Sequence, residues 1–159
     1  MSDSAARSIL FVCMGNICRS PMAEAMFRHK AVLRGVIDEF QLDSAGTGGW
    51  HAGDPPDDRM RRTAQRNGVE LDGAARQVRT SDFTEFDLII CMDEDNHANL
   101  LTMGAPTQRL RKMLEYHADE HAVDVPDPYY GGADGFQHVF DLLDHACDRL
   151  LDQLLTDDV

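Results

Sequence analysis

The chain has 159 residues, of which 43% are hydrophobic and 27% charged, and its 15 basic and 28 acidic residues give a formal charge of −13. These proportions exclude a disordered, collagenous or disulfide-scaffold protein and predict one folded domain over residues 1–159, with loose ends at 1–6 and 156–159. The charge argues against binding to nucleic acid or to an anionic membrane, because a polyanion would be repelled before specific contacts formed.

The charge is unevenly distributed along the chain. It is +3 over residues 1–36, −5 over 37–114 and −11 over 115–159. No apolar run approaches the roughly 18 residues that span a membrane, and the start of the chain lacks the order of a signal peptide. We therefore expect a cytoplasmic monomer without membrane insertion. Reduced thiols are expected for the four cysteines, which are Cys13, Cys18, Cys91 and Cys147.

The first elements predicted along the chain are a strand and a helix. A short apolar run indicates a buried strand over residues 8–13, followed by a loop at 14–16. Ser20 suits the N-cap of a helix and Pro21 its first position, and apolar residues at helical spacing continue as far as Gly35. The sequence therefore predicts a strand, a tight loop and a helix.

The strand and helix pattern then repeats. A strand is expected over residues 40–45 and a helix over 57–67. A second buried strand is expected over 88–92, and Asp93 can cap a helix that runs over 94–103. Such alternation indicates right-handed crossovers and a mostly parallel sheet covered on both faces, which is an α/β fold of three layers.

The C-terminal part contains one ambiguous segment and one clear helix. Residues 108–116 favour helix by composition, whereas their length and position favour an edge strand, and we predict a strand. From Gly135 to near the C-terminus, apolar residues follow the helical period.

The loop between the first strand and the first helix carries a Cys-x5-Arg pattern. In an open α/β sheet, ligands bind at the carboxyl ends of the strands, and the exposed N–H groups of a helix N-terminus favour an anion. Gly15 and Asn16 tolerate the positive φ that such a loop needs. We predict that a tetrahedral oxyanion is bound by Met14, Gly15, Asn16, Ile17, Cys18, Arg19 and Ser20.

Cys13 is the candidate nucleophile at this loop. The helix N-terminus, the loop amides and Arg19 all favour its thiolate, and Ser20 can donate a hydrogen bond to the sulfur. Arg19 can bind two phosphoryl oxygens through its planar fork. The alternative is that Cys13 simply ends a buried strand and Arg19 is a solvated residue of the first helical turn.

Transfer of a phosphoryl group to sulfur also requires a proton for the leaving oxygen. Asp127 is the candidate acid, because two prolines stiffen the backbone around this carboxylate and two glycines follow it. Taken alone, this segment could equally be an ordinary turn.

With these residues in place, the chain resembles the low-molecular-weight protein tyrosine phosphatases over nearly its whole length. The resemblance rests on Val12-Cys13-Met14-Gly15-Asn16-Ile17-Cys18-Arg19-Ser20-Pro21-Met22-Ala23-Glu24, on Ser44-Ala45-Gly46-Thr47, on Trp50-His51-x-Gly53-x-Pro55-x-Asp57-x-Arg59, on Met92-Asp93-x-x-Asn96 and on Asp127-Pro128-Tyr129-Tyr130-Gly131. It implies a flavodoxin-like, doubly wound domain with a four-stranded parallel sheet, and hydrolysis of phosphotyrosine and small aryl phosphates. It also implies a phosphocysteine intermediate on Cys13, with Asp127 first as acid and then as base, and no metal or cofactor.

The resemblance assigns further roles within this loop. Asn16 and Ser44 would keep the loop open by hydrogen bonds, and Ser20 would stabilise the thiolate. Cys18 would be the redox partner of Cys13 in a reversible disulfide, whereas the alternative for Cys18 is a small buried residue.

Aromatic residues would form the walls of the site. Trp50, Tyr129 and Tyr130 resemble the residues that flank a phenyl ring, and a deep slot would favour phosphotyrosine in protein substrates. Trp50 could instead belong to the core. A cognate tyrosine kinase could also act on Tyr129 or Tyr130.

The same loop leaves three other functions open. Thiol-dependent arsenate reductases of this fold use two further cysteines on a neighbouring segment, where Cys91 stands alone. Protein-arginine phosphatases typically carry Thr where this chain has Ile17. A non-catalytic phosphopeptide-binding module would keep the loop but lose turnover.

His117 and His121 could form a metal pair, although a solvated loop explains them better.

Overall fold

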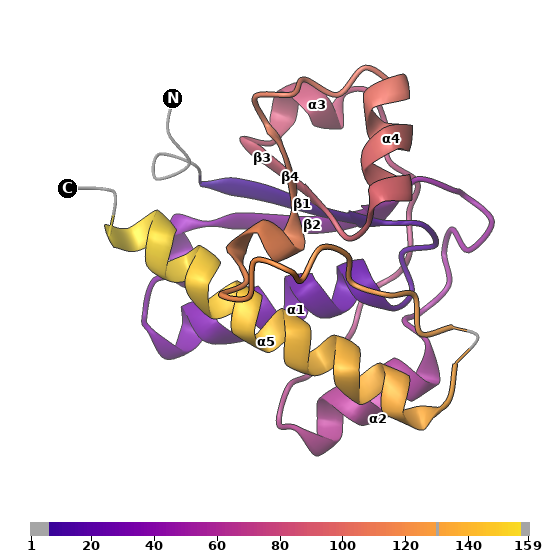
Figure 1. The fold of residues 1–159 in the computed structure, drawn as a ribbon, viewed down its shortest axis with the longest axis vertical. Helices are drawn as coiled ribbons and strands as arrows, with labels where there is room; N and C mark the ends of the chain where they lie inside the picture. The colour runs from indigo at the N-terminus through magenta and orange to yellow at the C-terminus, as the bar shows by residue number, and fades with distance from the viewer. Residues whose placement is uncertain (1–6, 130, 157–159) are drawn as a thin grey trace.

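The computed structural model describes residues 7–129 and 131–156 (Figure 1). Loose ends were expected at 1–6 and 156–159: residues 1–6 and 157–159 lie outside this range, whereas Thr156 is the last residue of α5. Within the described residues the sheet has four strands, all paired in parallel, in the order β2-β1-β3-β4. The strands are β1 (Ser8–Cys13), β2 (Gln41–Gly46), β3 (Leu88–Cys91) and β4 (Leu110–Lys112).

Helices cover both faces of this sheet (Figure 1). The helices α1, α2 and α5 lie on one side, and the helices α3 and α4 lie on the other. The helices are α1 (Arg19–Leu33), α2 (Asp58–Arg66), α3 (Asp82–Glu85), α4 (Glu94–Thr102) and α5 (Ala133–Thr156), with 3-10 turns η2 (Ile37–Glu39) and η3 (Met113–Tyr116). The predicted three-layer, flavodoxin-like α/β fold is confirmed.

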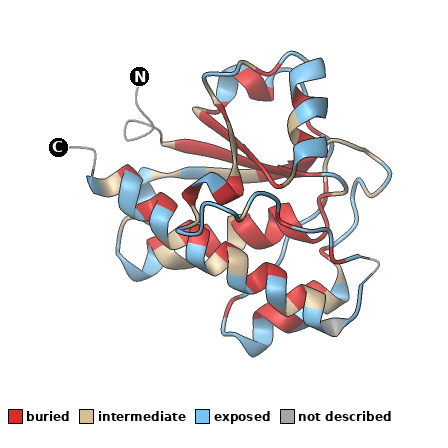
Figure 2. Cartoon of the chain, viewed as in Figure 1, coloured by how far each residue is buried: buried red, intermediate tan, exposed pale blue. Residues whose placement is uncertain are grey.

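The alternation of side chains along β1 divides the core in two. Ile9 and Phe11 pack in the cluster with α1 and α5, whereas Leu10 and Val12 pack in the cluster with α3 and α4. All six residues of β1 are buried, as Figure 2 shows for the central strands. Because β1 is buried on both faces, its carboxyl end is a rigid support for whatever follows it.

Two predictions about element boundaries need correction. Ser20 is not the N-cap of the first helix: α1 begins at Arg19 after Cys18, so Ser20 lies inside the first turn and its hydroxyl is free for other partners. The strand predicted over 108–116 is confirmed only over Leu110–Lys112 at the sheet edge, and the remainder forms η3. The short helices α3 and η2 were not predicted, because elements of three or four residues carry no periodic signal.

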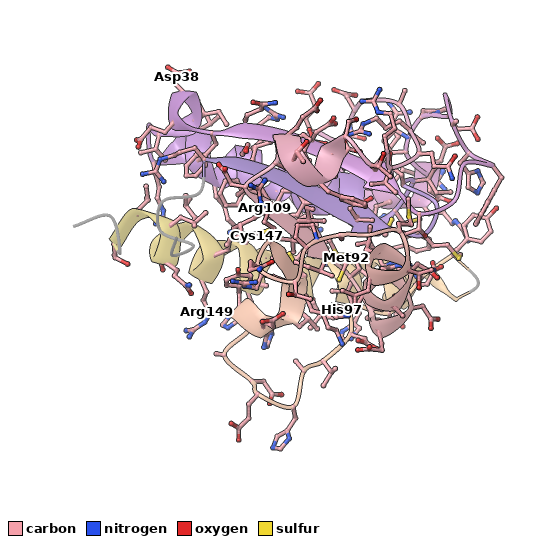
Figure 3. The ribbon with its side chains drawn as sticks, turned by 90° about the horizontal axis from the view of Figure 1, so that it is seen from above. Asp38, Met92, His97, Arg109, Cys147 and Arg149 are labelled. Atoms are coloured by element: carbon pink, nitrogen blue, oxygen red, sulfur yellow. The ribbon has the colours of Figure 1, made fainter. Side chains whose placement is uncertain are left out.

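Long-range hydrogen bonds hold the segments around the sheet. Arg109, before β4, donates Nη1 to the carbonyl oxygens of Phe83, Thr84 and Phe86 around α3. Arg149 of α5 donates Nε to the carbonyl oxygen of Tyr116 at a distance of 2.9 Å, which fixes the start of the segment that leads to Asp127. The positions of Arg109 and Arg149 can be followed in Figure 3.

Candidate active site

The loop that follows β1 surrounds the sulfur of Cys13 with hydrogen-bond donors. The backbone N–H groups of Asn16 and Ser20 point at Sγ from 3.3 and 3.5 Å, and the Ser20 hydroxyl lies 3.0 Å from it. Cys13 is buried, with 2% of its surface exposed. This sulfur lies at the start of α1 and at the carboxyl end of a central strand, where donors of this kind stabilise a negative charge.

Asn16 holds the loop in this shape. It is in the left-handed region, with φ of 58°, and its side chain is buried. Its Nδ2 donates to Ser20 Oγ at 2.8 Å and to Ser44 Oγ at 3.0 Å, and its Oδ1 accepts from the backbone N–H of Arg76 at 2.9 Å. The structure therefore brings Asn16, Ser20 and Ser44 into one hydrogen-bond network. The backbone N–H of Arg76 also belongs to this network, and no sequence pattern indicated its part.

Glycines allow the loop to lie close to its neighbours. Of the two residues expected to tolerate the positive φ of this loop, Asn16 has it and Gly15 does not. A Cβ atom on Gly15 would instead meet Cδ2 of His51 at 3.0 Å, so the glycine makes room for the imidazole. At Gly46, a Cβ atom would lie 2.7 Å from the carbonyl oxygen of Met14, which excludes a larger residue there.

The Arg19 guanidinium is buried behind the loop between two acidic residues. Its Nη1 donates to Asp93 Oδ2 at 2.5 Å and to the carbonyl oxygen of Val125 at 3.0 Å, and its Nη2 lies 3.6 Å from Asp127 Oδ2. Burial alone would lower the pKa of Arg19, but the Cys13 sulfur and the Asp93 and Asp127 carboxylates raise it above its ordinary value. The site is therefore built around a permanently charged arginine.

Asp93 was predicted only as a helix cap, and it also contacts the site. It caps α4 in a reciprocal box with Asn96, in which each side chain accepts from the other residue's backbone N–H. One carboxylate oxygen serves this cap, and the other accepts from Arg19. The family block that contains Asp93 and Asn96 was the available signal for this second contact.

Asp127 lies at the rim of the same cleft. Its Oδ1 accepts from the backbone N–H of Tyr129 at 3.0 Å, and 30% of its side chain is exposed. The structure therefore brings together a buried sulfur, a buried guanidinium and a partly exposed carboxylate, three groups far apart in the sequence. The residues that line the cleft are Cys13, Met14, Gly15, Ile17, Cys18, Arg19, Trp50, His51, Asp127 and Tyr129.

Aromatic side chains flank the opening of the cleft. Trp50 is 66% exposed, so the alternative that it belongs to the core is wrong, and Tyr129 is 36% exposed. Tyr130 lies outside the described residues. His51, which belongs to a family block but had no predicted role, also lines the cleft; its ring lies 6.2 Å from that of Tyr129, and its Nδ1 is 3.2 Å from Asp54 Oδ2.

The other cysteines differ from Cys13 in their surroundings. Cys18 lines the cleft as the N-cap of α1, and burial, followed by the charge of Asp57, raises the pKa of its thiol well above the ordinary value. Cys91 lies in β3, where burial raises its pKa to about 12, and Cys147 is buried in α5. All four cysteines are free thiols, and neither Cys91 nor Cys147 lines the cleft.

The described part of the chain holds neither a cluster of metal ligands nor a membrane-spanning helix. Among residues 7–129 and 131–156, no three His, Cys, Asp or Glu side chains are grouped as metal ligands, and His117 packs instead against His145 with 4.4 Å between ring centroids. No helix in the described part of the chain is long and apolar enough to cross a membrane.

Comparison with known proteins agrees with this geometry. A family model described as "Low molecular weight phosphotyrosine protein phosphatase" matches residues 8–159. The low molecular weight protein-tyrosine-phosphatase YfkJ of Bacillus subtilis is 46% identical over 147 residues, which cover 91% of this chain and 93% of that protein.

Solved structures show the same fold. A protein tyrosine phosphatase from Entamoeba histolytica, crystallised with Hepes in its active site, has a TM-score of 0.91 and 39% identity, over 97% of this chain and 100% of that one. The drosophila arginine phosphatase DARP has a TM-score of 0.87 and 33% identity, over 94% and 99% of the two chains. The sequence resemblance is thus confirmed, and the chain belongs to the low molecular weight phosphotyrosine protein phosphatases, a family of enzymes.

Proposed function

We propose that this protein hydrolyses phosphotyrosine in proteins, and small aryl phosphates, through a phosphocysteine intermediate on Cys13. The observation that carries the proposal is the convergence on one cleft of a buried, donor-surrounded sulfur, the Arg19 guanidinium and the Asp127 carboxylate. Family membership supports the same reaction class.

In the first step, the Cys13 thiolate attacks phosphorus. A sulfur–phosphorus bond forms and the bond from phosphorus to the phenolic oxygen breaks, while protonated Asp127 gives its proton to that oxygen. The loop amides of residues 14–20 and Arg19 bind the non-bridging oxygens. These donors are held in place before the substrate arrives, so little reorganisation is needed as negative charge develops.

In the second step, water attacks the phosphocysteine. Asp127, now a carboxylate, takes a proton from the water as the oxygen–phosphorus bond forms and the sulfur–phosphorus bond breaks. Inorganic phosphate leaves, and Cys13 returns as the thiolate that the Ser20 hydroxyl and the loop N–H groups stabilise. No metal or cofactor takes part in this proposed cycle.

The walls of the cleft favour an aryl group as the leaving group. Trp50 and Tyr129 offer exposed rings at the cleft, and buried Ile17 also lines it. A flat phenyl ring would pack against such walls, and a phosphoserine would be too short to fill them. The likeness to the drosophila arginine phosphatase makes phosphoarginine the second candidate substrate, and Ile17 is the residue that argues against it.

Turnover of an aryl phosphate by the wild type, Cys13→Ser and Asp127→Ala tests this proposal. We expect no turnover by Cys13→Ser and a loss of about 100-fold or more in kcat for Asp127→Ala on a phosphotyrosine peptide. Cys91→Ala is the matched control, because this cysteine is buried outside the cleft, and it should keep full kcat.

Three results would contradict the proposal. Hydrolysis unaffected by Cys13→Ser would exclude the phosphocysteine mechanism. Binding of phosphopeptide by the wild type without turnover would indicate the non-catalytic module. Faster hydrolysis of phosphoarginine peptides than of phosphotyrosine peptides would favour the second candidate.

We also propose several features that accompany this function. Residues 1–159 form one phosphatase domain, which acts as a monomer in the cytoplasm on phosphotyrosine-containing proteins. The free thiols of Cys13 and Cys18, which line the same cleft, support a reversible disulfide that protects the nucleophile. The exposure of Tyr129 supports its modification by a tyrosine kinase, for which Tyr130 is the alternative site.

A further inference from the structure

Arg59, in the first turn of α2, has its guanidinium turned back onto the residue that caps the same helix. Asp57 Oδ1 accepts from the Arg59 backbone N–H at 2.8 Å and from its Nε at 3.1 Å, while Oδ2 accepts from Nη2 at 3.0 Å. Burial alone would raise the pKa of Asp57, but these hydrogen bonds lower it below its ordinary value. The two-point contact fixes the plane of the guanidinium, as a lysine could not.

The carboxylate that holds Arg59 is attached to the phosphate-binding loop. The backbone N–H of Asp57 donates to the carbonyl oxygen of Ile17 at 2.8 Å. Ile17 is one residue before Cys18, the N-cap of α1. The position of the Arg59 guanidinium is therefore set relative to the loop that surrounds the nucleophile, although the two segments are about 40 residues apart in the sequence.

The guanidinium contacts two aromatic rings from another part of the chain. The Tyr129 ring centroid lies 5.2 Å from Arg59 Cζ, and the Phe136 centroid lies 4.7 Å from it. Phe136 is buried in α5, whereas Tyr129 borders the cleft. Both distances are within the range of attraction between a cation and an aromatic face. Arg59 therefore links the start of α2 to the segment that carries Asp127 and to the helix that follows it.

Tyr129 in turn is linked to the candidate acid. Its backbone N–H donates to Asp127 Oδ1 at 3.0 Å, which couples the position of this residue to that of the carboxylate. On the N-terminal side, Val125 is fixed by a hydrogen bond from its N–H to the carbonyl oxygen of Met92 and by one from Arg19 to its own carbonyl oxygen. Arg59 provides the corresponding contact on the C-terminal side of Asp127.

We propose that Arg59 is a positioning residue, which holds the Asp127 carboxylate over the cleft through Tyr129 without touching the substrate. This inference rests on the proposed function, because it gives Asp127 the role of the acid. It predicts a particular kinetic defect. A displaced acid slows the departure of leaving groups that need a proton, and it leaves the binding of the phosphoryl group to the loop unchanged.

Leaving-group dependence tests this proposal. We would measure kcat and KM of the wild type, Arg59→Met and Arg59→Lys on p-nitrophenyl phosphate, whose leaving group needs little protonation, on phenyl phosphate and on a phosphotyrosine peptide. For Arg59→Met we expect about a tenfold loss in kcat/KM on the last two substrates and less than about a threefold loss on the first, because kcat/KM reports the step in which Asp127 acts as the acid and not the later attack of water, which all three substrates share. Arg59→Lys keeps the charge without the planar contact and should resemble Arg59→Met.

Two further variants separate positioning from general damage. Arg62→Met removes an exposed arginine from the same helix and should match the wild type on all three substrates. In the background of Asp127→Ala, where there is no acid to position, Arg59→Met should lower kcat on the peptide by less than about twofold. A thermal unfolding curve for each variant checks that it is folded at the assay temperature. If Arg59→Met does not fold, the kinetics of Arg59→Lys test the proposal in its place.

The outcomes distinguish this inference from the proposed function. If Cys13→Ser abolishes turnover while Arg59→Met and Arg59→Lys keep the wild-type dependence on leaving group, only the role of Arg59 is wrong. An equal loss on all three substrates with a raised KM would also overturn it, since Arg59 would then act on substrate binding. Undiminished turnover by Cys13→Ser would instead refute the proposed function itself.

Discussion

Replacing Asn16 is the most direct test of what holds the loop after β1 in its shape. Asn16→Ala removes the three buried hydrogen bonds to Ser20, Ser44 and the backbone N–H of Arg76. At about 1 kcal/mol for each bond, their loss destabilises the fold by about 3 kcal/mol. The left-handed φ of 58° adds about 1 kcal/mol for a residue that has a Cβ atom but no local hydrogen bond.

Asn16→Gly is the matched control for this prediction. Glycine loses the same three hydrogen bonds but adopts a positive φ without strain, so it should be more stable than Asn16→Ala by about 1 kcal/mol. Both variants should lose most of kcat/KM, because the Ser20 hydroxyl and the loop N–H groups that face Cys13 are no longer held in place.

Urea unfolding of the three proteins, with kcat/KM measured on the same samples, provides the check. The urea concentration at the unfolding midpoint should be highest for the wild type, lower for Asn16→Gly and lowest for Asn16→Ala. The slope of the unfolding free energy against urea concentration should be the same for all three proteins. A midpoint for Asn16→Ala that corresponds to a loss below about 1 kcal/mol would refute the hydrogen-bond argument. Equal midpoints for the two variants would refute the strain argument.

Three other outcomes follow from single features. Asn96→Ala breaks the capping box that orients Asp93 toward Arg19, so urea unfolding should show a loss of about 1 kcal/mol and kcat should fall. Burial, followed by the charge of His145, lowers the pKa of His117 below 6.5, and its Nδ1 accepts from the backbone N–H of residue 119. The folded state therefore favours neutral His117. The contribution of the neutral imidazole to stability is complete above pH 6.5 and is lost as the pH falls through the folded-state pKa. Between about pH 7 and 5, the Tm of His117→Asn should therefore fall less than the Tm of the wild type. Because the chain carries a charge of −13, acidic phosphopeptides should have lower kcat/KM than basic ones at low salt, and added salt should narrow the difference; equal values at low salt would contradict a role of the charge in selection.

The loop was predictable because its properties are local. The apolar run of β1, the Cys-x5-Arg spacing and the start of α1 lie within residues 8–21, and the N–H groups of a helix start bind an anion in any context. The same locality explains the Asp93 cap, which is set within one helical turn. Short elements such as β4 and α3 were predicted in part or missed, since three or four residues show no period.

The sequence by itself predicted an anion site at the end of β1, and the family blocks named the residues that gather there. Only the tertiary structure decided what supports them, because those contacts join segments that no local rule connects. Asp93 reaches Arg19 across 74 positions, the N–H of Arg76 reaches Asn16 across 60, and Arg59 contacts the Tyr129 ring across 70. Strand order and helix packing set these distances, and neither depends on the residues at the contact alone.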